Sequence, residues 1–132
     1  MATATYKRGE IRTVKYLCGA TIAVYQIVIG GVVDAKKCRV LVAREAGVSG
    51  DTIICAASGV WEMPKVSAAV IKAGESVNYD ADGATTDAAV EDNAHTTGAG
   101  DVGQFGMAVE DAGNGVTTID VDIAEPGTYD AA

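Results

Sequence analysis

The chain has 132 residues and a formal net charge of −8, and 48% of its residues are hydrophobic while 21% are charged. This length predicts a single domain over residues 1–132, and the apolar content excludes a disordered chain, which could not bury a core. The acidic balance argues against binding to nucleic acid, because contact with phosphates requires a surplus of Lys and Arg.

The composition favours strands over helices. The chain holds 17 Val, 9 Ile and 12 Thr but only 2 Leu, and it has 16 Gly for tight turns. β-branched side chains are stiff at χ1 and pack well on a pleated surface. We therefore expect an all-β fold, a small β-sandwich or barrel with long surface loops and a flexible N-terminal arm.

The first third of the chain is predicted to begin with that arm and to continue into strands. Residues 1–8 are mostly small and polar and are expected to be flexible. Residues 11–16 alternate between apolar and polar side chains, which indicates a half-buried strand, and residues 22–29 are typical of a buried strand. Gly30–Gly31 is a candidate for a two-residue hairpin turn, after which Val32–Val33 would begin the returning strand.

The middle of the chain is predicted to hold short strands at 38–43, 51–57 and 60–63. Pro64 should end the third of these strands, because proline has no N–H to donate to a neighbouring strand. Residues 67–72 could form one or two helical turns.

The last third contains the longest predicted loop. A short strand at 76–79 leads into a turn, and residues 84–100 are rich in Ala, Asp, Thr and Gly. This composition predicts a long acidic surface loop with room for a short helix at 87–92. Strands are expected at 102–109 and 116–123. Apolar and polar residues alternate in the second of these, with three predicted inward (Ile119, Val121, Ile123) and three outward (Thr118, Asp120, Asp122).

Charge is divided unevenly along the chain. Residues 1–72 contain ten basic and five acidic residues, a net charge of +5, while residues 73–132 contain thirteen acidic and no basic residues, a net charge of −13. One interpretation is a set of solvated loops that keep the protein soluble. The other is that the protein has one basic face and one acidic face, and docks its basic face on an acidic partner.

The three cysteines and the apolar N-terminal region each allow two interpretations. Cys18, Cys38 and Cys55 lie in apolar runs without a CxxC motif, which favours buried thiols in a reducing compartment over a disulfide or a reactive thiol.

Residues 16–33 carry no charge and follow several basic residues, as in a signal anchor or membrane span. Because polar residues and Gly30–Gly31 divide this run into strand-length pieces, we expect no membrane segment.

Residues that could support catalysis or bind a metal are few. His95 is the only histidine and lies in a polar stretch, so a solvated loop residue is the favoured interpretation, and the chain lacks a nucleophile elbow and a phosphate-binding loop. Residues 78–83 match the start of an EF-hand loop, but its twelfth position is Ala89 where Glu is needed, and a β-turn explains the stretch equally well. A small hydrolytic enzyme would need His95 or the pair Asp120 and Asp122. We therefore expect no enzyme activity, no cofactor and no metal.

Four segments together resemble the family of capsid cement, or head decoration, proteins of tailed phages. A G-V-x-E-M-P-K element occupies Gly59–Lys65, and an I-x-x-G-E-x-V-x-Y-D segment occupies Ile71–Asp80. They are followed by a G-x-A-x-E strand at Gly106–Glu110 and a final alternating strand at Ile119–Ile123. In this order and spacing the resemblance extends over residues 6–123.

The resemblance implies an all-β structural protein of the virion. Such proteins are made in the host cytoplasm and bind the major capsid protein, commonly as homotrimers on the outer capsid surface where capsomers meet. There they stabilise the head against internal DNA pressure. The alternative is a β module of a virion spike or fibre that binds a glycan of the host surface, which would need an exposed aromatic shelf and few copies per particle.

The expected sites follow from the charge division and from Trp61. The basic first half is the better candidate for meeting the capsid, which leaves the acidic loops facing solvent. The residues expected to dock on the capsid are Tyr6, Lys7, Arg8 and Arg12. Trp61 suits either an interface or the core of a small β domain. The residues expected to make subunit contacts are Trp61, Met63 and Pro64.

Overall fold

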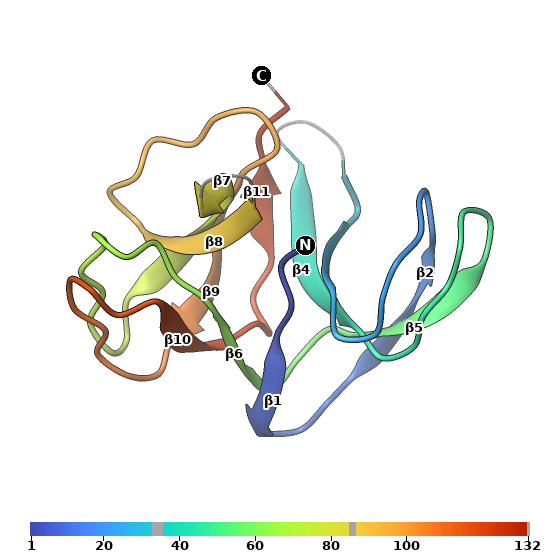
Figure 1. Cartoon of the computed structure of the whole chain (residues 1–132), viewed down its shortest axis with the longest axis horizontal. Helices are drawn as coiled ribbons and strands as arrows, with labels where there is room; N and C mark the ends of the chain where they lie inside the picture. The colour runs from blue at the N-terminus through green and yellow to red at the C-terminus, as the bar shows by residue number, and fades with distance from the viewer. Residues whose placement is uncertain (33–35, 85–86, 132) are drawn as a thin grey trace.

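The computed structural model describes residues 1–32, 36–84 and 87–131, and within them the chain forms strands and no helix. Within the described residues the strands pair with one another in antiparallel orientation, and the sheet curls into half of a barrel (Figure 1). The predicted all-β class is therefore confirmed. The strands are β1 (Thr5–Arg8), β2 (Thr13–Leu17), β3 (Ile27–Gly30), β4 (Lys37–Ala43), β5 (Thr52–Ala56), β6 (Val60–Pro64), β7 (Ser76–Ala84), β8 (Asp87–Asp92), β9 (Val102–Ala108), β10 (Thr118–Asp122) and β11 (Gly127–Tyr129).

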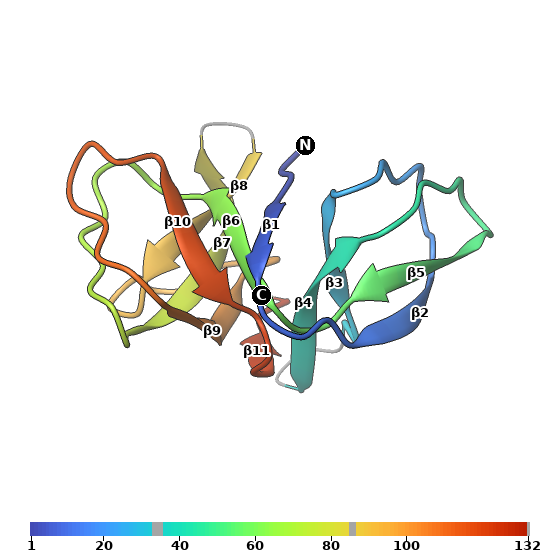
Figure 2. The same cartoon turned by 90° about the horizontal axis from the view of Figure 1, so that it is seen from below.

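Strand order differs strongly from chain order. The path through the sheet is β1-β6-β10-β9-β11-β4-β5-β2, with β3 attached to β4 and with β7 lying between β8 and β9. Figure 2 shows two groups of strands side by side: β2 to β5 form one half of the molecule, and β6 to β11 form the other. Strand β4 joins the halves, because it pairs with β3 and β5 on one side of the junction and with β11 on the other.

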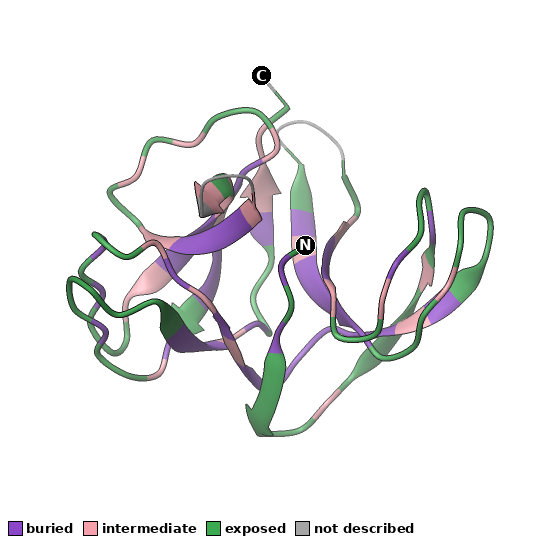
Figure 3. Cartoon of the chain, in the orientation of Figure 1, coloured by how far each residue is buried: buried purple, intermediate pink, exposed green. Residues whose placement is uncertain are grey.

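The hydrophobic core consists of two clusters. Buried residues occur in both halves of the molecule (Figure 3). The larger cluster lies mainly among β6 to β10 and contains the largest buried side chains, Trp61 and Phe105, with the Phe105 ring edge-on to Tyr79 at 6.2 Å between centroids. The smaller cluster lies among β3, β4 and β5 and includes Leu41 and Cys55. β-branched side chains fill much of both clusters, as the composition indicates.

Strand β10 shows the predicted alternation, with one difference. Ile119 and Val121 are fully buried, and Thr118 is exposed. Asp120, which we expected to face solvent, is buried as well. Asp120 is flanked by neighbouring strands on both sides, because β10 pairs with β6 along one edge and with β9 along the other.

Residues 1–8 are not the flexible arm that their composition predicts. Thr5–Arg8 form β1, which pairs with β6. Upstream of it, the Ala4 N–H donates to the carbonyl of Tyr25 (2.9 Å), and the carbonyl of Ala2 accepts from the Ile27 N–H (2.9 Å). Both alanines are buried. A sequence of small residues is compatible with close packing when another element offers a surface, and here β3 and β6 do so.

The expected loop at 84–100 is shorter than predicted, because residues 87–92 form β8 rather than a loop or a short helix. Strand β8 pairs with β7 and buries three consecutive side chains, Ala88, Ala89 and Val90. Residues 93–101 do form a loop, whereas residues 85–86 lie outside the described residues. The helical turns considered for 67–72 are also absent, since this segment is a turn and coil.

The predicted strand at 22–29 begins only at Ile27. Tyr25 has φ of 67°, a left-handed conformation that interrupts an extended chain. The two-residue hairpin turn expected at Gly30–Gly31 is wrong: β3 and β4 are antiparallel neighbours, but Gly30 lies in β3 and pairs with Arg39, so the connection between the strands is longer than two residues. Val32 is not in a strand, and Val33 lies outside the described residues. No helix among the described residues has the length and apolar character needed to cross a membrane.

Deletion of residues 1–8 should destabilise the fold by at least about 2 kcal/mol, because it leaves β6 without its outer partner and uncovers the Trp61 ring, which Tyr6 contacts edge-on at 5.4 Å. The free energy of unfolding in urea measures this loss. The matched control is Lys7→Ala, which keeps β1 and removes only an exposed ion pair with Glu62, at a cost below about 1 kcal/mol. A deletion variant as stable as the full chain would contradict the structural role of β1.

Candidate functional site

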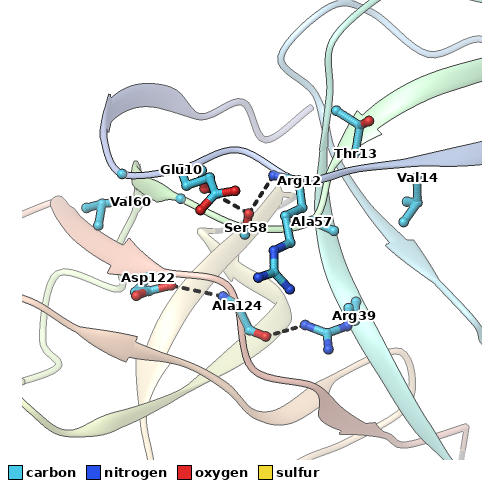
Figure 4. A pocket seen from close by; sticks show the side chains of 12 residues that line it. Glu10, Arg12, Thr13, Val14, Arg39, Ala57, Ser58, Val60, Asp122 and Ala124 are labelled. Carbon is cyan, nitrogen blue, oxygen red and sulfur yellow. Dashed lines mark hydrogen bonds between the residues drawn. The ribbon is translucent and has the colours of Figure 1, made fainter.

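Two connecting segments run side by side where the halves of the molecule meet. The segment from β1 to β2 lies against the segment from β5 to β6, and Ser58 joins them. The Ser58 hydroxyl accepts a hydrogen bond from the Arg12 N–H (2.7 Å) and donates one to the carbonyl of Glu10 (2.8 Å). Figure 4 shows these bonds beside the cavity that the two segments border.

This junction cavity has a volume of about 550 Å³ and is lined by two arginines, Arg12 of the β1–β2 connection and Arg39 of β4 (Figure 4). Arg39 of β4 donates a hydrogen bond to the carbonyl of Ala124. The backbone N–H of Ala124 in turn donates to the carboxylate of Asp122 (3.0 Å). Among the described residues, neither Arg12 nor Arg39 has an ion-pair partner. Glu10 and Asp122 line the same cavity, but because neither arginine forms an ion pair among the described residues, both guanidinium groups can still bind a carboxylate or another anion.

A second cavity, of about 610 Å³, adjoins the first, because Val14 and Arg39 line both. It adds Lys15 and Lys37, and none of its described lining residues is acidic. Its apolar surface comes largely from β2 and β4, including Leu17. We call the two cavities together the basic groove, defined by Arg12, Lys15, Lys37 and Arg39. The tertiary structure thus gathers on one surface cations that lie up to 27 positions apart in the sequence.

The expected docking residues do not all lie in this groove. Tyr6, Lys7 and Arg8 lie on β1, where Tyr6 donates from its hydroxyl to the carbonyl of Gly9 (2.6 Å). Lys7 is 3.8 Å from Glu62, whereas Arg12 alone of the four predicted residues lines the groove. Residue spacing could not reveal Arg39 as the neighbour of Arg12, because their proximity depends on the order of the strands.

The expected subunit contacts need correction. Trp61 and Met63 are fully buried, at 0% exposure, so neither side chain is available to a neighbouring subunit. The Trp61 indole N–H donates to the carbonyl of Ser58 (3.1 Å), which satisfies its polar atom inside the protein. Pro64 is half-buried at the end of β6. Alternate residues of β6 face the core, and this places Trp61 and Met63 on the same inner side.

His95 is not the solvated loop residue that the sequence favours. Its Nε2 atom lies 3.4 Å from a carboxylate oxygen of Asp80 and 3.5 Å from one of Asp101. Asp101 is buried, and its two oxygens accept from the N–H groups of Ala81 (2.9 Å) and Gly98 (2.8 Å). The three side chains could together hold a divalent cation, and they also tie the 93–101 loop to β7. The EF-hand arrangement is absent at 78–83, which belong to strand β7.

Buried titratable groups serve the core. Cys18, Cys38 and Cys55 are free and buried, which confirms the interpretation as core thiols. Burial, reinforced by the nearby Cys18 and Glu45, raises the pKa of Cys55 to about 11, so its reactive thiolate is scarce at neutral pH. Lys65 is also buried, and burial lowers its pKa. Its ammonium donates to backbone carbonyls of the next turn, among them that of Val66 (2.6 Å).

A fold does not by itself define a function, but a charged surface groove on a small all-β fold is suited to a structural or binding role. Comparison with known families agrees with this class. The model of the phage cement protein family matches residues 6–123, and the chain therefore belongs to that family. No curated protein and no solved structure matched the chain. Family membership supports a structural role in the phage capsid and association with it.

The raised pKa of Cys55 predicts that stability falls in alkali. The unfolded thiol, with its ordinary pKa of 9.0, loses its proton before the folded thiol, whose pKa is about 11. The contribution of this group is therefore complete below about pH 9 and declines as the pH rises towards 11, by up to about 1.4 kcal/mol per pH unit. Urea unfolding of the wild type and Cys55→Ala between about pH 8 and pH 11 measures the slope. We expect a shallower decline for the variant, and parallel declines would contradict the assignment.

Proposed function

We propose that this protein binds the outer surface of the phage capsid at junctions between capsomers, where it contacts the major capsid protein and stabilises the head against internal DNA pressure. The observation that carries the proposal is the family match over residues 6–123. The role requires no catalysis and no cofactor. In this proposal the protein is made in the host cytoplasm and acts as a part of the virion, as one domain over residues 1–132.

The charge distribution supports docking through the first half of the chain. The four cations of the basic groove, which form no ion pair with any described residue, belong to that half, while residues 73–132 carry a net charge of −13. A basic face that meets an acidic capsid surface would leave the acidic loops towards solvent, where they discourage contact with other acidic proteins. Tyr6, Lys7, Arg8 and Arg12 remain the proposed docking residues, and Arg12 has the strongest support because it lines the groove.

The proposal includes a homotrimer on the capsid. Trp61 and Met63 cannot form its contacts as they stand, which leaves Pro64 from the expected set. Many copies on a closed shell need only a modest interface each, because their contributions act together. Analytical ultracentrifugation of the free protein and symmetry-resolved imaging of decorated heads together test whether a trimer exists before or only after docking.

Addition of the protein to heads that lack it should raise the temperature at which they release DNA, because each bound copy adds interface between capsomers. Dye fluorescence of released DNA during heating measures this temperature. The double variant Arg8→Glu, Arg12→Glu should bind the heads about tenfold more weakly or worse, whereas Arg44→Glu, which alters an exposed arginine outside the groove, should bind as the wild type does. Wild-type protein that neither binds heads nor is found in purified particles would overturn the proposal.

One observation favours the glycan-binding alternative. Tyr6 and Tyr25 are 44% and 48% exposed, and they line a cavity of about 280 Å³ together with Ala4 and Thr5. Tyr25 has a left-handed backbone that is strained for a residue other than glycine, and strain of this kind is common at functional sites. An exposed pair of aromatic rings beside a small cavity can pack against the apolar face of a sugar.

The alternative predicts that the protein binds polysaccharide from the host surface and that Tyr25→Ala loses this binding, since the aromatic face is removed. Tyr25→Phe is the matched control, because it keeps the ring and the backbone strain and removes only the hydroxyl. Glycan-array fluorescence measures binding. Absence of binding by the wild type, or equal binding by Tyr25→Ala, would eliminate the glycan function.

A further inference from the structure

Strand β2 ends the sheet and leaves its inner side partly uncovered. It pairs with β5 alone among the described strands, with Val14 opposite Cys55 and Tyr16 opposite Ile53. Residues opposite one another in an antiparallel pair have their side chains on the same face. Because Cys55 and Ile53 are buried, Val14 and Tyr16 also point towards the inside of the curled sheet.

Val14 nevertheless remains 41% exposed, and Leu17, at the end of the same strand, is 67% exposed. The larger cavity of the basic groove lies against this stretch and continues to Leu41 of β4 and to Gly30. A Cβ atom at Gly30 would lie only 2.8 Å from the Leu41 side chain, so a larger residue there would crowd the groove wall. An unpaired strand edge beside an apolar, open cavity is a surface to which an extended peptide can add as a further strand.

The charges around this edge restrict the chemistry of such a peptide. Lys15 and Lys37 line the larger cavity, Arg12 lines the smaller one, and Arg39 lines both. Lys37 donates to the Thr128 hydroxyl (3.2 Å), and Arg39 donates to a backbone carbonyl. Glu10 and Asp122 line the smaller cavity beside Arg12 and Arg39, but among the described residues none of the four cations forms an ion pair, and no acidic residue lines the larger cavity. Carboxylates are the natural partners, because a guanidinium presents parallel N–H donors that match their two oxygens.

We propose that the basic groove binds an extended acidic segment of the major capsid protein, which adds to the free edge of β2, places apolar side chains against Val14 and Leu41, and pairs its carboxylates with Lys15 and Arg39. This inference rests on the proposed function and identifies the chemistry of its partner. The volume of the larger cavity, about 610 Å³, lies within the range of small ligand sites and suits a few side chains rather than a folded domain. The net charge of −8 disfavours nucleic acid as the occupant.

The test uses undecorated heads of the same phage and synthetic peptides tiled over its major capsid protein. Co-sedimentation with heads measures binding, and the peptides are added as competitors. We expect one acidic peptide to compete, and we expect Lys15→Glu, Arg39→Glu to bind heads at least about tenfold more weakly than the wild type. Arg44→Glu is the matched control, because it reverses the charge of an exposed arginine that lies outside both cavities.

Hydrogen exchange of the wild-type protein is a second measurement, and it is independent of whether the variants fold. On bound heads or with the competing peptide, amides of residues 14–17 should exchange more slowly, since a new strand covers the edge of β2. Circular dichroism and urea unfolding establish that each variant is folded.

The outcomes separate the inference from the function on which it rests. If the wild type binds heads and the variant Lys15→Glu, Arg39→Glu binds equally well, the groove inference is wrong while the cement function stands. The same conclusion follows if residues 14–17 gain no protection from hydrogen exchange. If the wild type does not bind heads, the proposed function itself fails. If the double variant keeps its affinity for heads and instead loses self-association in ultracentrifugation, the occupant is a second copy of this chain, and the capsid segment is excluded.

Discussion

Burial of strand β4 on both of its faces is the constraint on which the rest of the structure depends. Val40 and Val42 belong to the larger cluster and Leu41 and Ala43 to the smaller one, so the two clusters meet across one strand. A strand in this position must be almost entirely apolar, because an unpaired polar side chain on either face would lose its hydration. Lys37 and Arg39 are the exceptions, and both lie in the first half of the strand, where it borders the groove. Two of the four cations of the proposed docking groove therefore lie on a largely buried strand, which gives them a rigid support.

The N-terminal residues hold the two halves together around this strand. Ala2 and Ala4 bond to backbone groups next to and within β3, in the smaller half, and β1 then pairs with β6 in the larger half. The chain next passes through Gly9–Arg12, which borders the junction cavity and is tied to the opposite segment by Ser58. The same residues thus close the fold and shape one wall of the groove, so a change in one should affect the other.

The division of charge suits a protein that works in many copies on a shell. A net charge of −8 opposes non-specific association between copies, while a local basic groove provides attraction to an acidic surface at short range. Modest contacts become sufficient when a closed shell presents the same site many times. The acidic second half is also structural: Asp101 orders the 93–101 loop by accepting two backbone N–H groups, and it does so beside His95.

Local sequence determined the all-β class, most strand positions and the inward face of β10, because period-2 patterning and β-branched residues act between neighbours in the chain. It misplaced residues 1–8 and 87–92, whose small residues become strands only when a distant strand offers pairing and cover. Residue type alone was compatible with a core position or an interface position for Trp61, and its complete burial shows that it belongs to the core. Only the tertiary structure showed that Arg39 lies beside Arg12, 27 positions away, and that His95 lies beside Asp80, 15 positions away. Such proximity depends on the order of the strands, which arises from long-range contacts that no local sequence pattern records.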